Sequence, residues 1–500
     1  MAPWLGVLLS LNTTVLLCIL LLILMFLALS SPGKSSLRFP PGPRPLPIIG
    51  NLHLLDIRRQ DLSYMKISEE YGPVFSLFFG SQRVVVVTGY EAVTEALMSK
   101  GSEFVDRPVV PVFHHMNHEN GLFFSVGDLW KTTRRFTLSS LRELGMGKTR
   151  LERRIHEELP FLMEKIRAFK GEAFDLLEFS GAATNVAFTL FFGDRFDYAD
   201  PIFNIFLRNI HEIIGLLGVP HLQIYNVYPY LGFLFKPHKT ILKRSHETFA
   251  VLKKFVRMGK QNINENHLES YVDKVVFQQQ EEEKHKEKNT FYDDNILSSL
   301  LDLVIAGTET TATTIRWAIV LMMKYPDIQK KVQEEIHGVL GTERLPTYED
   351  RKQLPFTEAV IHEIQRFASV VPQFPRSTAV DTHFRGYFIP KGTMVIPSLT
   401  SVLYDKTQWE TPFRFNPNHF LDDKGNYVKK EAFIPFSIGR RNCPGEAVGR
   451  MEVFLFFAGL LQKFTFRPPH GVTEADLDLS YVSAFTRRPQ SYSTRAVPCT

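Results

Sequence analysis

One cysteine of this chain stands in a setting that favours its thiolate form. The segment Phe436–Gly445 reads Phe-Ser-Ile-Gly-Arg-Arg-Asn-Cys-Pro-Gly, and Cys443 leads directly into a helix-like run. A free cysteine thiol titrates near about 8.5, but a helix N-terminus and nearby guanidinium groups favour the anion. Because the thiolate is the form that ligates metal, this loop is a candidate metal-ligating site.

A single sulfur ligand points to iron in a porphyrin. A zinc or iron-sulfur site would need more cysteines and histidines, and the chain contains only Cys18, Cys443 and Cys499. Gly439 and Gly445 would let the backbone approach a flat macrocycle, and Arg441 could pair with a propionate. The alternative is that Cys443 is a small buried residue in a turn, which is how most lone cysteines behave.

A second group of residues could handle protons. Ala306-Gly307-Thr308-Glu309-Thr310-Thr311 lies in a long helical pattern, where glycine costs about 1 kcal/mol relative to alanine and threonines compete for helix carbonyls. A loosened helix with an acid and an alcohol at its edge could hold water and pass protons to a group bound beside it. The alternative is a satisfied kink in a core helix.

Two charged or aromatic pairs have helical spacing. Glu363 and Arg366 meet on one helix face, and Trp130 and Arg134 are one turn apart, where an indole and a guanidinium could bind an anion such as a propionate. A zinc-protease reading of His362-Glu363 fails because the second histidine would stand at the position of Arg366. The loop histidines are assigned no metal: His114, His115 and His118.

Helices must position most of these groups. Helical patterns dominate at 151–170, 240–265, 295–325, 326–340 and 354–368, whereas strands are few and short, at 84–87, 388–390 and 393–396. The polar run 278–289 is expected to be a solvated loop between helices. The aromatic stretch 216–235 is broken by glycines and prolines, so ordinary core and a surface that dips into a membrane both stay open.

The composition describes an ordinary globular enzyme behind a membrane anchor. The chain is 44% hydrophobic, and its net charge of +5 is too small and too scattered to indicate nucleic-acid binding. Three cysteines cannot build a disulfide framework, which favours a reducing compartment.

The N-terminal residues 1–33 carry no charge and are long enough to span a bilayer. Positive residues follow the run, which predicts a cytosolic body; a cleaved secretory signal is the alternative. A Pro-rich spacer, residues 34–49, comes next.

The Cys443 segment resembles the haem-binding loop of the cytochromes P450, Phe-x-x-Gly-x-Arg-x-Cys-x-Gly, at every fixed position. The resemblance covers the chain from the anchor to beyond Cys443 and looks closest to the second family of animal microsomal enzymes. It implies a mainly α fold with small β-sheets, one haem domain at 50–500 behind the anchor and linker, and haem b with an axial cysteine thiolate.

The family pattern also assigns roles to individual residues. Glu309 and Thr310 would form an acid–alcohol pair, and Glu363, Arg366 and Arg414 a structural triad. The residues expected to hold the haem are Arg107, Trp130, Arg134, Arg376, Phe436, Arg441 and Gly445, with Cys443 on the iron. The residues expected to line the substrate pocket are Val112, Phe113, Leu303, Ala306, Val370, Val371, Phe374, Ala484 and Phe485.

The resemblance implies a monooxygenase of the endoplasmic reticulum membrane that inserts one atom of O2 into fatty acids, steroids or xenobiotics. Because the chain has no convincing nucleotide-binding fingerprint, its electrons must come from elsewhere. The resemblance implies that they come from NADPH through a flavoprotein reductase, with cytochrome b5 as a further partner. The proposed docking face is basic: Lys131, Arg135, Lys429, Lys430 and Arg440. A haem-thiolate isomerase or dehydratase, and a haem-binding sensor or carrier, are the alternatives.

Overall fold

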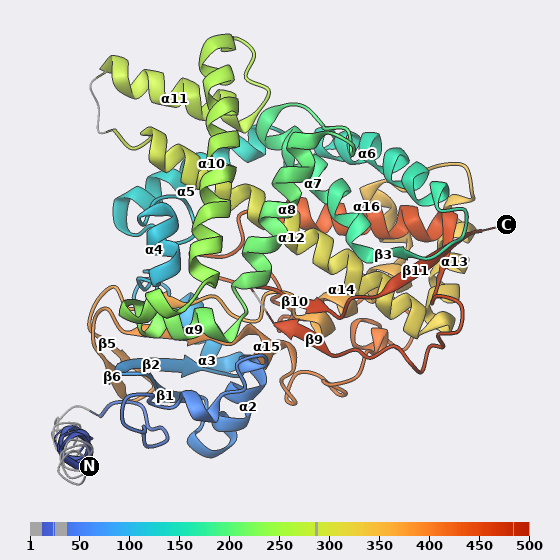
Figure 1. Ribbon diagram of the computed structural model, residues 1–500. Helices are drawn as coiled ribbons and strands as arrows, with labels where there is room; N and C mark the ends of the chain where they lie inside the picture. Colours follow the sequence, from blue (N-terminus) through green and yellow to red (C-terminus); the bar gives the residue numbers. More distant parts are fainter. Residues whose placement is uncertain (1–12, 24, 26–37, 286–288, 484, 500) are drawn as a thin grey trace, which may run out of the picture.

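Helix α12, Asp293–Lys324, runs through the middle of the body (Figure 1). Acidic residues in its first turn suit the positive end of the helix dipole, and Pro326 limits its extension. Apolar side chains occur all round the helix, so it is buried between other elements, chiefly α7 (Ser180–Phe192), α14 (Pro355–Ala368) and α16 (Glu446–Lys463). The computed structural model describes residues 13–23, 25, 38–285, 289–483 and 485–499.

The bounds of the other helices are α2 Gln60–Tyr71, α3 Tyr90–Thr94, α4 Pro111–Asn117, α5 Gly127–Glu143, α6 Thr149–Ala168, α7 Ser180–Phe192, α8 Pro201–Leu216, α9 Pro220–Val227, α10 Pro237–Asn262, α11 Tyr271–His285, α13 Pro326–Leu340, α14 Pro355–Ala368, α15 Leu399–Leu403 and α16 Glu446–Lys463. The helices that contact α12 directly are α7, α8, α10, α13, α14 and α16, and the others complete the body around them. Short turns complete the set: η1 Leu52–Leu54, η2 Glu95–Ser99, η3 Leu176–Phe179, η4 Pro229–Leu234, η5 Tyr348–Gln353 and η6 Pro417–Phe420.

The strands are short and form small sheets beside the helices (Figure 1). The four-stranded sheet has the order β1-β2-β7-β4, from Val74–Phe79, Gln82–Val87, Met394–Pro397 and Arg376–Ser377. Strands β1 and β2 form an antiparallel hairpin, and β2 pairs in parallel with β7, Val84 opposite Met394. The remaining sheets pair β3 Phe174–Asp175 and β8 Phe464–Arg467 with β11 Ser493–Pro498, β9 Tyr481–Ser483 with β10 Arg487–Pro489, and β5 Thr382–Phe384 with β6 Tyr387–Ile389.

The mainly helical fold with small sheets is the one that the sequence predicts. Each long predicted helix is present within a few residues, as α6, α10, α12, α13 and α14, and the predicted strands are β2, β6 and β7. The polar run at 278–289 is different, because α11 extends through it to His285. Glutamine, glutamate and lysine are good helix formers, so a polar composition indicates exposure there rather than a loop.

Most of the predicted membrane anchor lies outside the described residues. In the part of the chain that the structure describes, no single helix is both long and apolar enough to cross a bilayer; α8 and α9 reach that length only as a pair bent by 69°. Downstream, the Pro-rich segment packs on β1, where the backbone N–H of Ser76 donates to the carbonyl of Pro41 at 2.7 Å.

Candidate functional site

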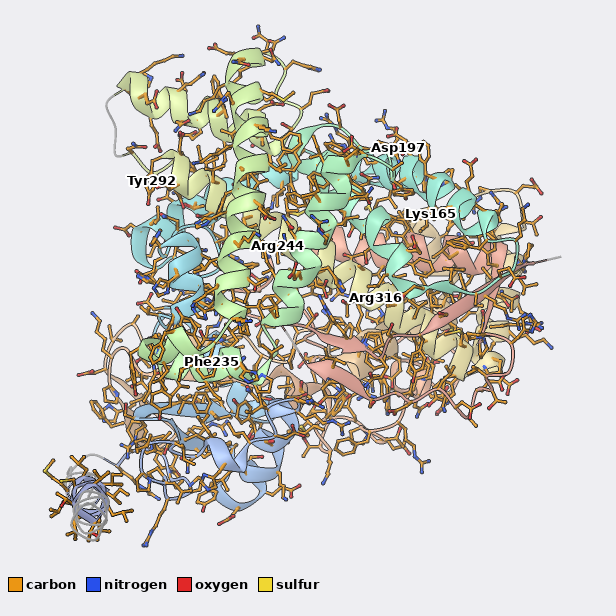
Figure 2. The ribbon with its side chains drawn as sticks, in the orientation of Figure 1. Lys165, Asp197, Phe235, Arg244, Tyr292 and Arg316 are labelled. Atoms are coloured by element: carbon orange, nitrogen blue, oxygen red, sulfur yellow. The ribbon has the colours of Figure 1, made fainter. Side chains whose placement is uncertain are left out.

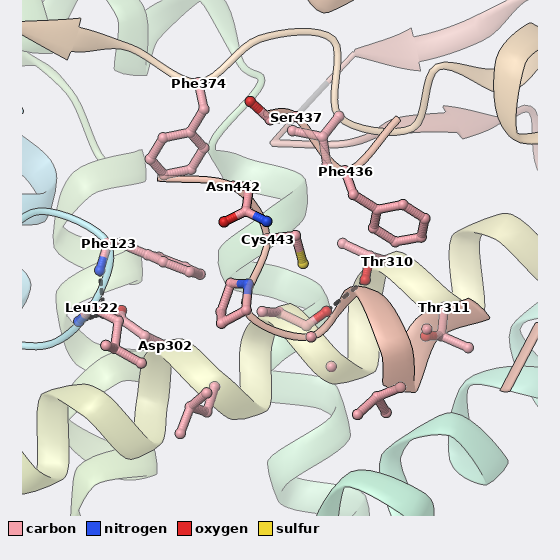
Figure 3. Close-up of a pocket in the computed structure, with 18 of the residues that line it drawn as sticks. Leu122, Phe123, Asp302, Thr310, Thr311, Phe374, Phe436, Ser437, Asn442 and Cys443 are labelled. Atoms are coloured by element: carbon pink, nitrogen blue, oxygen red, sulfur yellow. Dashed lines mark hydrogen bonds between the residues drawn. The ribbon is translucent and has the colours of Figure 1, made fainter. Parts of the chain in front are cut away.

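A cavity lies between helix α12 and the segment that carries Cys443 (Figure 3). In Figure 3 the sulfur of Cys443 points into the space between that segment and α12, with Phe436 and Thr310 nearby. The walls bring together segments far apart in the sequence, from Arg107 to Phe485. The fold therefore joins the two groups of residues that the sequence singles out for chemistry.

The cysteine loop has a tightly constrained backbone. Cys443 donates its backbone N–H to the carbonyl of Phe436 at 2.9 Å, and Gly445 is the N-cap of α16. Gly439 has φ +79°, and a Cβ on it would lie 1.9 Å from the carbonyl oxygen of Leu97. Only glycine fits this combination of left-handed backbone and close contact.

The sequence predicts that the loop lowers the pKa of Cys443, but burial dominates. Burial raises the thiol pKa to about 11, although a backbone hydrogen bond at Gly445 and the charge of Arg134 act in the opposite direction. The groups expected to stabilise the thiolate are therefore present, but alone they are too weak to offset burial. A bound metal cation deprotonates a coordinating thiol outright, so the thiolate depends on the metal.

Two arginines tie the cysteine loop to α5 and to the segments between η2 and α5. Arg134 on α5 donates from Nη2 to both the carbonyl and the side-chain oxygen of Asn442, each at 2.7 Å. Arg441 donates to the carbonyls of Val105 at 2.9 Å and Ser125 at 2.7 Å. Trp130 does not line the cavity but packs behind it, with its ring centroid 3.8 Å from the guanidinium carbon of Arg441.

Two further arginines complete a buried cationic cluster. Arg107 donates from Nε to the carbonyl of Phe123 at 2.8 Å, and Arg376 from Nη2 to the carbonyl of Arg441 at 3.3 Å. The Nε and Nη1 of Arg376 are buried and have no hydrogen-bond partner. Burial, together with the neighbouring positive charges, lowers the pKa of Arg376 to about 9 and that of Arg441 to about 8.

This cluster fits a cofactor with two carboxylates. Arg107, Arg134, Arg376 and Arg441 all line the cavity, and among the described residues of its wall only Asp302 and Glu452 are acidic. Neither acid forms an ion pair with these arginines within the described chain. Buried charges require a counterion, and a haem carries two propionates together with iron for the cysteine. The residues present therefore fit haem.

The opposite wall comes from α12. Ala306, Gly307 and Thr310 all line the cavity, and the Thr310 hydroxyl donates to the carbonyl of Ala306 at 2.7 Å. The helix is continuous through this segment. Thr310 thus satisfies its hydroxyl within the helix, as threonines in helix interiors commonly do, while its side chain stays at the cavity wall.

Glu309 does not join Thr310 there, because adjacent residues of a helix face different directions. Its Oε1 accepts hydrogen bonds from Arg488 at 2.7 Å, Thr486 at 2.9 Å and Thr313 at 2.9 Å, and lies 3.5 Å from Arg316. Burial opposes ionisation, but the charges of the two arginines outweigh it and hold the pKa below its usual value. Arg316 lies within the body (Figure 2), so the predicted acid of the pair belongs to a buried ionic cluster.

Sequence reasoning missed two buried carboxyls of the cavity. Asp302 accepts the backbone N–H groups of Leu122 at 2.7 Å and Phe123 at 2.9 Å, and Glu452 accepts the hydroxyl of Thr311 at 2.8 Å. Burial raises the pKa of Asp302 to about 7 and that of Glu452 to about 8. The available signal was an acid inside an apolar run, Leu-Leu-Asp-Leu-Val for Asp302.

Some of the residues expected in the substrate pocket lie in the wall of this cavity, and others do not. The predicted pocket residues that lie in the cavity wall are Leu303, Ala306, Val370, Val371, Phe374 and Phe485. Val112 and Phe113 are not in its wall; Val112 is buried in the core, and Phe113 stacks on Phe124 with ring centroids 4.4 Å apart. Ala484 lies outside the described residues.

The Glu363–Arg366 pair is fully buried on α14. Arg366 donates from Nε and Nη2 to the two carboxylate oxygens of Glu363, each at 2.7 Å. In place of the expected guanidinium of Arg414, His419 is the third side chain, with Nδ1 3.1 Å from Glu363. Arg414 takes part through its backbone carbonyl, which accepts a hydrogen bond from Arg366 at 2.9 Å, while its own side chain is not part of the cluster.

A family model described as "Cytochrome P450" matches residues 40–495. Among the curated proteins, the chain is 47% identical to human cytochrome P450 2W1 over 92% of this chain and 94% of that protein. It is 45% identical to cytochrome P450 2K1 of Oncorhynchus mykiss over 97% of both chains, and 41% identical to cytochrome P450 2C3 of Oryctolagus cuniculus over 96% of this chain and 98% of that one.

Proposed function

This chain belongs to the cytochrome P450 family, and on that premise we propose that it oxidises lipophilic substrates such as fatty acids, steroids or xenobiotics at the endoplasmic reticulum membrane. It is a haem-thiolate monooxygenase whose cofactor is haem with a cysteine ligand, and it uses O2 and NADPH-derived electrons. A flavoprotein reductase would supply these electrons, and cytochrome b5 is a second proposed partner.

The observation that carries this proposal is the meeting of Cys443 with the buried arginine cluster at one cavity. Cys443 is the proposed iron ligand. Arg107, Arg134, Arg376 and Arg441 would bind the propionates, with Trp130 supporting them from behind. The bound haem supplies the iron at which dioxygen is activated and one oxygen atom is passed to a substrate C–H bond.

The remaining wall determines which molecules reach that chemistry. Val370, Val371, Phe374 and Phe485 form an apolar surface that excludes water and favours lipophilic compounds. Thr310 presents the alcohol of the proposed pair at this wall. For Glu309 to move a proton toward the cavity, its carboxylate would first have to leave Arg488, so we propose that Thr310 handles protons at the cavity and Glu309 holds α12 against β10.

The proposed partner surface surrounds the cysteine loop. Helix α5 contributes Lys131 and Arg135 beside Arg134, which itself binds Asn442; Lys429 and Arg440 are also exposed. Such a face would steer an acidic redox partner toward the haem. Because screening weakens exposed charges, reductase-supported turnover should fall as salt rises; turnover independent of salt would exclude this role for the face.

A membrane location is supported by apolar side chains near the Pro-rich segment. Ile48 is 61% exposed and Phe233 73% exposed, and the hydroxyl of Tyr228, which precedes η4, donates to the carbonyl of Ile48. Exposed apolar residues beside an N-terminal apolar run suit a body that rests on the bilayer to which it is anchored. We propose a single-pass anchor in residues 1–33, a spacer at 34–49 and a cytosolic catalytic domain at 50–500.

One experiment tests the central assignment. The reduced protein should bind carbon monoxide with the red-shifted Soret band of thiolate-ligated iron, and Cys443→Ser should abolish that band while haem is still bound. Lipophilic compounds should then give products only with reductase, NADPH and oxygen. Product formation without reductase would indicate an isomerase or dehydratase instead.

A further inference from the structure

A second cavity, of about 340 Å³, lies behind the cysteine loop. Its walls come from η5, α14, the segment before the cysteine loop and α16. Gln365 lines both this cavity and the haem cavity. The volume of this second cavity falls within the range of about 300–1,000 Å³ that is typical of small-molecule sites.

The walls of this cavity are strongly cationic. Arg351, Lys429, Lys430 and Arg450 line it, and the one acidic residue among the described lining is Glu358. Arg351 approaches Glu358 only at 3.5 Å, and its Nε is buried without a hydrogen-bond partner. Glu446, outside the lining, pairs with Arg450 at 2.9 Å. Positive charge therefore exceeds the negative charge that the protein itself provides.

His362 fixes one of these cations without adding a charge. Its Nδ1 is 2.8 Å from the carbonyl of Glu358, and its Nε2 is 3.0 Å from Nη1 of Arg450. A guanidinium can only donate, so Nε2 accepts and Nδ1 carries the proton. Burial, with the charges of Arg450 and Arg351, lowers the His362 pKa to about 3, which agrees with a neutral ring.

We propose that this cavity binds a small molecule bearing a phosphate group. A phosphate offers several acceptor oxygens and up to two negative charges, which suits separate cations placed around a hollow. The Nε of Arg351 is a buried donor without a partner, and Tyr348 and Tyr427, whose hydroxyls are further donors, line the same wall. An anion would satisfy these donors and relieve the repulsion between the cations.

A ligand in this cavity would affect both the haem environment and the proposed partner surface. The guanidinium carbon of Arg450 is 5.0 Å from the ring centroid of Phe436, whose carbonyl accepts the N–H of Cys443. Lys429 and Lys430 belong to the proposed docking face for the reductase. A bound phosphate compound would therefore compete with the electron donor, a consequence that rests on the proposed function.

Calorimetric titration of the haem-loaded protein with inorganic pyrophosphate tests the site, with sodium chloride holding ionic strength constant. Saturable binding to one site is expected, with a small shift of the Soret band. Arg351→Gln and Lys430→Gln should each weaken pyrophosphate binding about tenfold to a hundredfold, because each removes a charge-assisted hydrogen bond. Lys406→Gln makes the same charge change on an exposed lysine that is not in the lining, and should leave binding unchanged.

Several results would overturn the proposal. Absence of saturable heat would exclude the site, and equal loss in Lys406→Gln and Lys430→Gln would show non-specific charge attraction. Tighter binding of citrate than of pyrophosphate would refute the phosphate assignment. In a separate arm, pyrophosphate should slow reduction of the iron by the reductase but not by dithionite. If binding persists without that slowing, the docking face is refuted and the anion site stands.

Discussion

Replacing Glu363 with glutamine removes one charge from the most enclosed ion pair of the described chain. The side chains of Glu363 and Arg366 are both 0% exposed. Besides Arg366, the Glu363 carboxylate accepts the backbone N–H of Asn416 at 2.8 Å and faces Nδ1 of His419 at 3.1 Å. Glutamine keeps the shape of the side chain but turns an NH2 group toward these donors and leaves the guanidinium without its counterion.

The expected cost is large because the Arg366 charge stays buried. Removing one member of a buried ion pair costs about 3–5 kcal/mol. Since about 1.4 kcal/mol corresponds to a factor of ten, the population that has lost its native fold should rise by about two to more than three orders of magnitude. Arg366 also donates to the carbonyls of Leu403 and Pro412, each at 2.8 Å, so the damage should reach the segment that leads to the cysteine loop.

The matched control is Glu334→Gln on α13. Glu334 also pairs with a cation on its own helix, Lys330 at 3.8 Å, but the two side chains are 66% and 76% exposed. An exposed helical pair contributes only about 0.3–0.5 kcal/mol, so this variant should behave as the parent protein.

Both measurements follow the thiolate-type absorbance of the reduced carbon monoxide complex. The first is the urea concentration at which half of this absorbance is lost, and the second is the rate of its loss at a fixed temperature. The midpoint for Glu363→Gln should lie far below those of the parent and Glu334→Gln. If the two variants lose the absorbance at the same urea concentration, burial does not make the Glu363–Arg366 pair more important than an exposed pair.

Three further predictions follow from the cavity. Gly439→Ala should prevent formation of the thiolate-bound haem complex, whereas Gly386→Ala, with φ +82° and nothing within 4 Å of its Cβ, should cost only about 1–2 kcal/mol in thermal stability. Thr310→Val should lower the product formed per NADPH consumed, whereas Glu309→Gln should mainly lower the denaturation midpoint; the opposite pattern would restore Glu309 as the acid. Burial raises the pKa of Asp302 from 3.8 to about 7, so between these values the folded protein retains a proton that the unfolded chain releases. The contribution of this proton to stability is therefore complete below about pH 4 and is lost as the pH rises through 7. Asp302→Asn should remove that component from urea midpoints measured between pH 4 and 8, and an unchanged pH dependence would contradict it.

The sequence predicted best what depends on local periodicity and on short motifs. Helix α12 appears because its apolar positions continue for several turns, and the loop around Cys443 is defined by glycines whose backbone requirement is local. The cofactor class also followed, since a lone cysteine among arginines leaves few alternatives. These features need no knowledge of which distant segments meet.

The structure differs from these expectations in side-chain direction and in distant partners. Glu309 and Thr310 are adjacent in sequence, yet only Thr310 lines the cavity, because adjacent residues of a helix face different directions. Glu309 instead binds Arg488 of β10 and Thr486 of the turn before it. His419 likewise takes the place expected for the Arg414 guanidinium. Its contact with Glu363 could not be predicted from sequence spacing. The sign of the Cys443 pKa shift also needed the fold, since burial outweighs the charges that the sequence displays.

These three differences have one physical origin. A motif tells which charges are available, whereas burial decides which charges the protein can tolerate without a partner. Glu309 and Glu363 are each neutralised by arginines within the protein, but the described cavity wall offers Arg376 no such partner. The cationic cluster therefore stays incomplete until an anion enters, and the thiol of Cys443 stays protonated until a metal does. Loss of Arg376 should accordingly matter little to the apoprotein and weaken haem retention in the loaded one, which separates a residue that holds the cofactor from one that holds the fold.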